Sequence, residues 1–253
     1  SSLGSPLQAT AVTSATTGYL LRTSDGTDWG TCSTSFTDIS STGTSLGLAT
    51  AQSATDIVMP FDLTFYGVVS DTLHIGNQGW ILFGQRSELP TEYDCNFLYD
   101  NSWSGSSAPG MGIYPFCDSL GVNTGAVYVD TLGATPNRRF IVQWDDRRIP
   151  VGNSDGNTVT FQAVLYEDSN RIDFVYHDVV VTGTYASSYS LGGEASVGLR
   201  RDDAYSLQYW SPRWSDYYGP QLAPRLHNGL ALCFTPISGP IREAYLPLAL
   251  RNN

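Results

Sequence analysis

Residues 43–47 (GTSLG) have the letters of a nucleophile elbow, in which the central serine, here Ser45, attacks an acyl carbon. That chemistry needs the serine on a sharp turn between a strand and a helix, with an acid and a histidine elsewhere in the chain. No helical pattern follows Ser45, and the stretch resembles the edge of a β-sheet. We therefore predict no catalytic residue here, and we expect a protein that is not an enzyme.

Neighbouring acids occur twice, as Asp145-Asp146 and as Asp202-Asp203. Two carboxylates on either side of a glycosidic bond could hydrolyse it, but they would have to face one another. Neighbours in a strand point to opposite faces of the sheet, and neighbours in a turn cap backbone amides. Both pairs are therefore predicted to have turn or solvent-exposed roles.

Metal ligands are sparse in this sequence. His74 and His177 lie within alternating strand patterns, where a histidine is usually structural. Residues 153–157 (NSDGN) have oxygen-bearing side chains at the spacing of a calcium loop, but glycine is not at the sixth position and no glutamate is at the twelfth. We predict a hairpin turn there, with bound calcium as the alternative. No other metal and no cofactor is expected.

Aromatic residues are densest at 209–218, and the cluster includes Trp210, Trp214, Tyr217 and Tyr218. Such a cluster could stack on sugars, anchor a protein interface or cover one end of the fold. All three interpretations are open at this point.

Four cysteines, Cys32, Cys95, Cys117 and Cys233, form no CxxC pair, which argues against zinc and predicts two disulfides formed in an oxidising compartment. Three connectivities are possible. We favour Cys95–Cys117 within one loop region and Cys32–Cys233 as a tie between the two ends of the domain.

Charge and composition point to a secreted protein. A net charge of −11 is unsuited to binding nucleic acid or an anionic membrane, and no apolar run is long enough to insert into a bilayer. The chain contains no lysine, which excludes Schiff-base chemistry and lysine isopeptide cross-links. Its start, without methionine or an apolar leader, predicts an extracellular product whose signal peptide has been removed.

Alternating apolar and polar residues predict strands along most of the chain. The clearest are three in succession, with Asp168-Ser169-Asn170 as a tight turn between the last two. No convincing helix is present. We therefore predict an all-β fold, an antiparallel β-sandwich or jelly roll in a single large domain. The expected strands are 58–67, 71–84 with a break at 77–79, 112–120, 125–132, 138–149, 158–167, 171–181, 194–200, 205–210 and 229–235.

Several phrases, in this order, resemble the bacterial nidogen-type (NIDO-like) extracellular domain over about residues 29–210. They are FDLTFYG (61–67), GNQGWILFG (76–84), IYPFCDSL (113–120), GATPNRRFIVQW (133–144), TFQAVLYEDSNRI (160–172) and ASVGL (195–199). The resemblance implies a β-rich adhesion and matrix module without catalytic residues. The family usually has Trp-Asp-Asp where this chain has Cys117-Asp118-Ser119, and the preceding loop is expanded around Cys95, which further supports a Cys95–Cys117 disulfide.

These patterns divide the chain into an extended N-terminal segment (1–28), the β-sandwich with its aromatic extension at 209–228 (29–236) and a C-terminal tail (237–253). The first segment contains a possible donor strand at 7–17, with Leu7 and Val12. The end of the tail is similar to a short tail on many secreted bacterial surface proteins. Alternation places Ala244, Leu246, Leu248 and Leu250 on one face of the tail, and Pro247 restricts it to an edge position in a sheet.

The resulting hypothesis is a structural or adhesive protein that binds copies of itself, or other surface and matrix components, through a terminal strand added to a sheet edge. In that case copies would assemble head to tail into a filament. Both terminal segments could instead fold back onto their own sandwich. The alternatives are a carbohydrate-binding module that uses the 209–218 aromatics to bind glycans, and an accessory domain of a secreted hydrolase.

Overall fold

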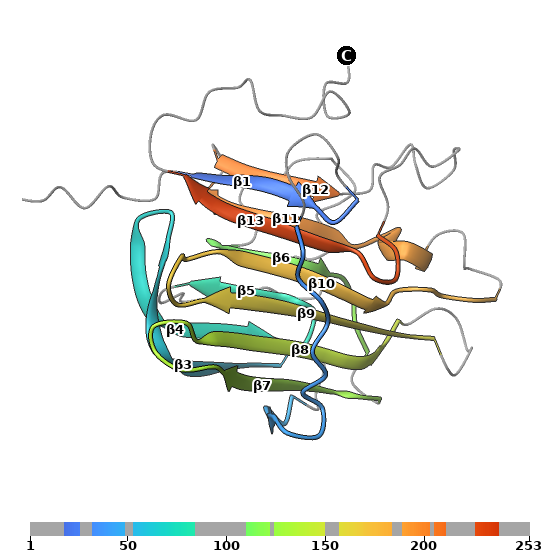
Figure 1. The fold of residues 1–253 in the computed structure, drawn as a ribbon. Coiled ribbons are helices and arrows are strands. Elements are labelled where there is room, and N and C mark those ends of the chain that lie inside the picture. Colours follow the sequence, from blue (N-terminus) through green and yellow to red (C-terminus); the bar gives the residue numbers. More distant parts are fainter. Residues whose placement is uncertain are drawn as a thin grey trace, which may run out of the picture.

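The computed structural model describes residues 18–25, 32–48, 53–83, 110–121, 124–149, 157–183, 189–202, 205–210 and 226–237. Two antiparallel sheets pack face to face as a β-sandwich, which confirms the predicted fold class (Figure 1). Helical structure in the described residues is limited to a short 3₁₀ turn, Ser190–Gly192.

The larger sheet has seven strands. Their spatial order is β1 (Gly18–Thr23), β13 (Ala231–Ile237), β10 (Ile172–Asp178), β9 (Thr158–Tyr166), β8 (Arg139–Arg148), β7 (Ala126–Leu132) and β2 (Thr44–Ser45).

The smaller sheet has six strands. Their order is β12 (Tyr205–Trp210), β11 (Ser196–Asp202), β6 (Gly112–Cys117), β5 (Trp80–Phe83), β4 (Val68–Gly76) and β3 (Ala54–Phe65). In Figure 1, β1 and β12 lie at one side of the sandwich, and β3 and β7 lie at the opposite side.

The predicted run of three strands is β8, β9 and β10, each paired with the next. Asn170 has a φ of 52°, a left-handed conformation that asparagine tolerates in a tight turn, so the predicted β9–β10 hairpin is confirmed. Strand β10 ends at Asp178, before the predicted residue 181. The reason is that the Val179 amide donates to the side-chain oxygen of Asn228 (2.8 Å) instead of continuing the ladder.

Aromatic rings fill the space between the sheets. Phe161 stacks on Trp144 (5.0 Å between centroids) and on Phe116 (5.1 Å) from the facing sheet. The indole N–H of Trp144 also donates to the Gly76 carbonyl at 2.9 Å, which links the two sheets by a buried hydrogen bond. Gly79 is required beside this stack, because its φ is 78° and a Cβ there would lie 1.9 Å from the Phe116 carbonyl oxygen.

Strand β1 comes from the segment that sequence analysis placed outside the domain. It pairs with β13 of the same chain, from Gly18 opposite Ile237 to Thr23 opposite Leu232. This part of the N-terminal segment thus completes its own sheet. Residues 1–17, with Leu7 and Val12, lie outside the described residues, as does the tail from 238 with Leu246, Leu248 and Leu250.

Residues 32–43, called the strap below, cross the outer face of the larger sheet from β13 to β7 (Figure 1). Along this path the strap contacts one strand after another. The contacts are a Cys32–Cys233 disulfide on β13, Thr34 with Asp173 on β10, Thr37 with Gln162 on β9, Ile39 with Gln143 on β8 and Thr42 with Asp130 on β7. The predicted Cys32–Cys233 pairing is therefore confirmed.

Candidate functional site

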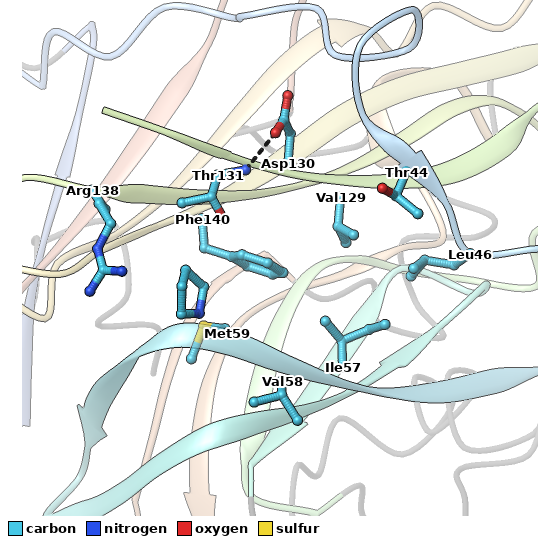
Figure 2. Close-up of a pocket in the computed structure, with 11 residues that line it drawn as sticks. Thr44, Leu46, Ile57, Val58, Met59, Val129, Asp130, Thr131, Arg138 and Phe140 are labelled. Atoms are coloured by element: carbon cyan, nitrogen blue, oxygen red, sulfur yellow. Dashed lines mark hydrogen bonds between the residues drawn. The ribbon is translucent and has the colours of Figure 1, made fainter. Parts of the chain in front are cut away.

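An open cleft of about 640 Å³ lies at one side of the sandwich, between the edges of the two sheets. Its walls come from residues 57–60 of β3, residues 129–131 of β7, Thr44 and Leu46 at β2, and Arg138 and Phe140 at β8. Figure 2 shows Leu46, Val129 and Phe140 on one side of the cleft and Ile57 and Met59 on the other. The volume is within the range of ligand-binding pockets in proteins.

The shape of β3 opens the cleft on one side. The register of β3 against β4 shifts between Val58 and Leu63, so the intervening residues form a bulge at the sheet edge. Pro60 lies in this bulge, where the missing N–H costs no ladder hydrogen bond. Val58 is 68% exposed, the highest exposure among the large hydrophobic residues described.

The shortness of β2 opens the cleft on the other side. β2 pairs with β7 at Tyr128 and Val129, and the Leu46 amide donates to the Val127 carbonyl at 2.9 Å. The rest of β7, from Asp130 to its end at Leu132, extends past this partner. An unpaired sheet edge of this kind can accept an added strand.

Charged and polar groups at the cleft are already bonded within the chain. The Arg138 guanidinium donates to Glu167 through Nε (2.7 Å) and Nη2 (2.5 Å), and it lies 5.4 Å from the centre of the Phe61 ring. The hydrogen bond to Glu167 raises the pKa of Arg138 and lowers that of Glu167. Asp130 accepts from the Thr131 amide (2.7 Å) and from the Thr42 hydroxyl (3.3 Å).

The cleft therefore suits an extended, largely apolar segment. Its apolar walls would bury side chains, and the β3 and β7 edges offer backbone groups to a strand lying between them. No sequence pattern indicates this cleft, because it depends on where β2 ends and where β3 bulges.

Ser45 has no catalytic surroundings in the structure. It lies exposed on β2, its hydroxyl accepts from the Gly47 amide (3.4 Å), and no helix follows it in the described residues. Each histidine has a partner elsewhere: His74 bonds to Asp56, His177 stacks on Phe36 (4.5 Å) and His227 bonds to Asp25 (2.6 Å).

The acidic pairs do not converge. The register of β8 against β9 shifts between Trp144 and Arg147, and Asp146, with a φ of 48°, lies in this irregularity, where its amide donates to the Thr160 hydroxyl. Burial raises the pKa of Asp145, which accepts from the Gln143 side chain (3.0 Å). Asp202 bonds to Arg201 (2.6 Å), and Asp203 lies outside the described residues.

The aromatic cluster is described only at its start. Tyr209 on β12 is 9% exposed and belongs to the main core, and burial raises the pKa of its hydroxyl to about 12. It is therefore a core residue and not part of a sugar platform. Trp210 ends β12, whereas Trp214, Tyr217 and Tyr218 lie outside the described residues.

Two further predictions can be placed only in part. Cys117 is disulfide-bonded, but Cys95 lies outside the described residues, so the Cys95–Cys117 pairing stays a prediction. Residues 153–156 of the calcium-like stretch also lie outside them. The Asn157 side chain bonds to the backbone of Thr182, donating to its carbonyl and accepting from its amide at 3.0 Å each.

A second polar feature lies at the end of the smaller sheet and was also missed. Asp118 follows β6 and is 3% exposed, and Glu194 lies just before β11. Burial raises the pKa of Asp118 to about 6, and burial together with the charge of Asp118 raises that of Glu194 to about 7. Only the pairing of β6 with β11 brings these distant residues together, so no sequence pattern could have indicated it.

Comparison with known proteins gives one match. The family described as NIDO related matches residues 29–236, which covers both sheets except β1 and the last residue of β13. Domains of this family are typically extracellular, and the family is all-β and non-catalytic. No curated protein and no solved structure matches the chain. In the part of the chain described above, no helix is long and apolar enough to cross a membrane.

Proposed function

The chain belongs to the NIDO-related family, and we propose on that premise that it is a non-catalytic, extracellular structural and adhesive protein. Its copies join when the C-terminal segment of one copy docks as a strand in the cleft of the next. The observation that carries this proposal is the open apolar cleft between two sheet edges, with Val58 exposed beside it.

The C-terminal segment has the chemistry that the cleft would select. Ala244, Leu246, Leu248 and Leu250 alternate along it, so a strand of these residues presents one apolar face. Burying such a face is favourable by about 25 cal/mol per Å² of apolar surface. Pro247 is compatible with a strand at a sheet edge, which is the position that the cleft offers.

The fold favours docking between copies. Residue 238 follows Ile237 on β13, which lies beside the β1 edge, whereas the cleft is formed by β3 and β7 at the opposite side of the sandwich. The outer face of the larger sheet, the direct path between these edges, is already crossed by the strap. A segment that leaves at one edge and a cleft at the other edge lead to head-to-tail assembly.

Size-exclusion chromatography with light scattering, together with electron microscopy, tests this proposal on three chains: the full chain, a chain lacking 238–253 and the Val58→Asp variant. Val69→Asp is the matched control, because Val69 is 61% exposed on β4 but does not line the cleft. We expect assemblies from the full chain and the Val69→Asp variant, and monomers from the other two. A synthetic peptide of residues 241–253 should bind the shortened chain but not its Val58→Asp form.

Assemblies that persist without 238–253 but disappear without 1–17 would show N-terminal strand donation instead and contradict the proposal. A monomeric full chain whose own tail protects the cleft from the peptide would show docking within one copy. Specific binding to a glycan array that Trp214→Ala abolishes, with no change in assembly, would favour the carbohydrate-binding alternative.

A further inference from the structure

One carboxylate at the cleft covers part of the β7 edge. Asp130 Oδ1 accepts a hydrogen bond from the Thr131 amide (2.7 Å), which Figure 2 marks, and Oδ2 accepts one from the Thr42 hydroxyl at the end of the strap (3.3 Å). Both donors are neutral, so neither contact neutralises the charge of Asp130. An incoming segment would therefore meet a negative charge at this edge.

The amide that Asp130 covers is one that an added strand would need. The Leu46 amide donates to the Val127 carbonyl at 2.9 Å, so Val127 turns its backbone groups toward β2. Alternate residues of a strand turn their backbone groups the same way, and the pairing of β7 with β8 is unbroken, so Thr131 turns its groups to this same edge. β2 reaches only to Val129, which leaves the Thr131 amide to Asp130. Charged side chains commonly protect sheet edges in this way.

The charges of the cleft are unbalanced. Among the described residues that line it, two are charged, Arg138 and Asp130. Arg138 is held by Glu167 through two nitrogen atoms (2.7 and 2.5 Å), whereas the partners of Asp130 are neutral. A docking segment that brings a positive charge to Asp130 is therefore favoured over a neutral or an acidic one.

The C-terminal segment carries a positive charge on the face that Asp130 would meet. Arg251 follows Leu250, so in a strand it points away from the apolar face of Ala244, Leu246, Leu248 and Leu250. In a strand added beside β7, this apolar face would continue that of Val129, which belongs to the main core. Arg251 would then lie on the face of Asp130, whose partner across the ladder, Ile141, belongs to the apolar cluster beneath the strap.

We propose that Asp130 selects the docked segment by binding the guanidinium of Arg251 from the neighbouring copy, an inference that rests on the docking of the C-terminal segment proposed above. As the carboxylate moves to Arg251, it releases the Thr131 amide, which then bonds to the backbone of the incoming strand. Glu243 lies on the same face as Arg251 but about 27 Å away in an extended strand, and its charge would repel Asp130. The pair therefore determines which part of the C-terminal segment lies beside β7.

Exchanging the two charges tests this proposal in full chains. The readout is the concentration at which half of the chain is assembled, measured by light scattering. Arg251→Asp should raise this concentration about tenfold or more, because two carboxylates then face each other. Adding Asp130→Arg to the same chain should return it to within about threefold of the unmodified value, because the ion pair is restored with its charges exchanged.

Neutral variants test the pair without reversing a charge. Asp130→Asn keeps an oxygen that can accept from the Thr131 amide, so we expect a folded chain, and far-ultraviolet circular dichroism verifies this. Asp130→Asn and Arg251→Gln should each raise the half-assembly concentration by about fivefold. The double variant should assemble no less readily than either single variant, because all three lack the same ion pair.

Two matched controls come from the same chain. Asp62→Asn removes an exposed acid of β3 that does not line the cleft, and it should leave assembly unchanged. Arg242 belongs to the C-terminal segment but lies on its leucine face, so Arg242→Asp should not restore assembly to the Asp130→Arg chain.

Salt gives a further readout. Copies with a net charge of −11 repel one another, so sodium chloride at about 0.5 M should strengthen assembly of every variant. The same salt should narrow the difference between the unmodified chain and Arg251→Gln, because it screens the ion pair. A difference that widens with salt would contradict an ionic contact.

The outcomes separate this inference from the proposed function. Losses that add up in the double neutral variant, or a rescue by Arg242→Asp equal to that by Arg251→Asp, would overturn the pairing. Assembly that needs residues 238–253 but ignores both charges would overturn the pairing and leave the proposed function intact. An unmodified chain that stays monomeric, or that assembles without 238–253, would contradict the proposed function and this inference with it.

Discussion

Two surfaces that meet at β7 are built in opposite ways. The outer face of the larger sheet is crossed by the strap, which is held by a disulfide and by hydrogen bonds to buried or half-buried polar side chains. The cleft on the other side of β7 has apolar walls, and its polar groups are bonded to the chain itself. Polar pairs hold a covering segment in a single register, because each buried group needs its own partner. An apolar cleft instead binds a partner whose shape fits it and whose apolar side chains it buries.

The strap side shows how specific such pairing is. Gln162 is fully buried, and its amide donates to the Thr37 carbonyl (2.6 Å) and to Gln143 Oε1 (2.7 Å). Gln143 in turn accepts from the Ile39 amide at 2.9 Å. A shift of the strap by one residue would leave these buried groups without partners, so the network admits a single position.

The largest effect should come from removing the tie at the start of the strap. Cys32→Ser/Cys233→Ser opens a disulfide with a sequence separation of 201, which in the chain-entropy model is worth up to about 5 kcal/mol. Urea unfolding of this variant should show a much lower midpoint. Reduction of the unmodified chain, which also opens the disulfide of Cys117, should lower the midpoint at least as far. A change below about 1 kcal/mol would mean that the polar contacts alone hold the strap.

A smaller loss is expected at the next contact of the strap. Asp173 is 0% exposed and accepts hydrogen bonds from Thr34, Arg171 and Tyr166. Asp173→Ala should lower the free energy of unfolding by about 2–4 kcal/mol, because charged hydrogen bonds are lost and donors are left unpaired. Chemical denaturation measures the loss, and the exposed Asp71→Ala serves as control. Equal effects of the two substitutions would show that the strap network contributes nothing.

Substitution in the cleft should change stability very little. Val58→Asp alters an exposed side chain, so the free energy of unfolding should stay within about 0.5 kcal/mol of the unmodified value, as expected for surface positions. Differential scanning calorimetry of the shortened chain, without 238–253, isolates this effect from assembly. A loss of several kcal/mol would show that Val58 belongs to the core and that the contrast between the two surfaces is wrong.

The smallest effect concerns the exposed hydrogen bond between His227 and Asp25. The hydrogen bond that the His227 ring donates to Asp25 raises the pKa of His227 above its usual 6.5, and the hydrogen bond to the Asn228 carbonyl adds to this effect. A raised pKa in the folded state stabilises the fold fully below the unfolded pKa, and this contribution disappears as pH rises through the folded value.

The melting temperature of His227→Gln should therefore lie below that of the unmodified chain at about pH 5 and converge with it by about pH 9. Both side chains are about half exposed, so solvent screening limits the difference to about 0.5 kcal/mol or less. A difference that grows with pH would contradict the assigned pKa direction.

The sequence predicted the strands well, because period-two alternation reports a buried face directly. It also predicted the β9–β10 hairpin, from turn residues such as Asn170, and the Cys32–Cys233 tie. The strap was not predicted, since its contacts run from backbone groups to side chains such as Gln143 and Gln162 and leave no periodic pattern. Strand β1 was missed because its position becomes clear only once β13 provides an edge for it. The Asp118–Glu194 pair and the cleft depend on strand pairing between residues far apart in sequence.

The pairing of β1 with β13 determines how the protein would respond to a pulling force. Gly18 lies opposite Ile237, so the chain enters and leaves the sandwich at the same point. Force applied across the two flanking segments would peel these strands apart one residue pair at a time, which resists less than shearing whole strands past each other. The Cys32–Cys233 bond interrupts this unzipping where Arg22 lies opposite Cys233. Under tension the molecule would lengthen slightly and then reach a covalent stop, while the aromatic stack between the sheets stays closed.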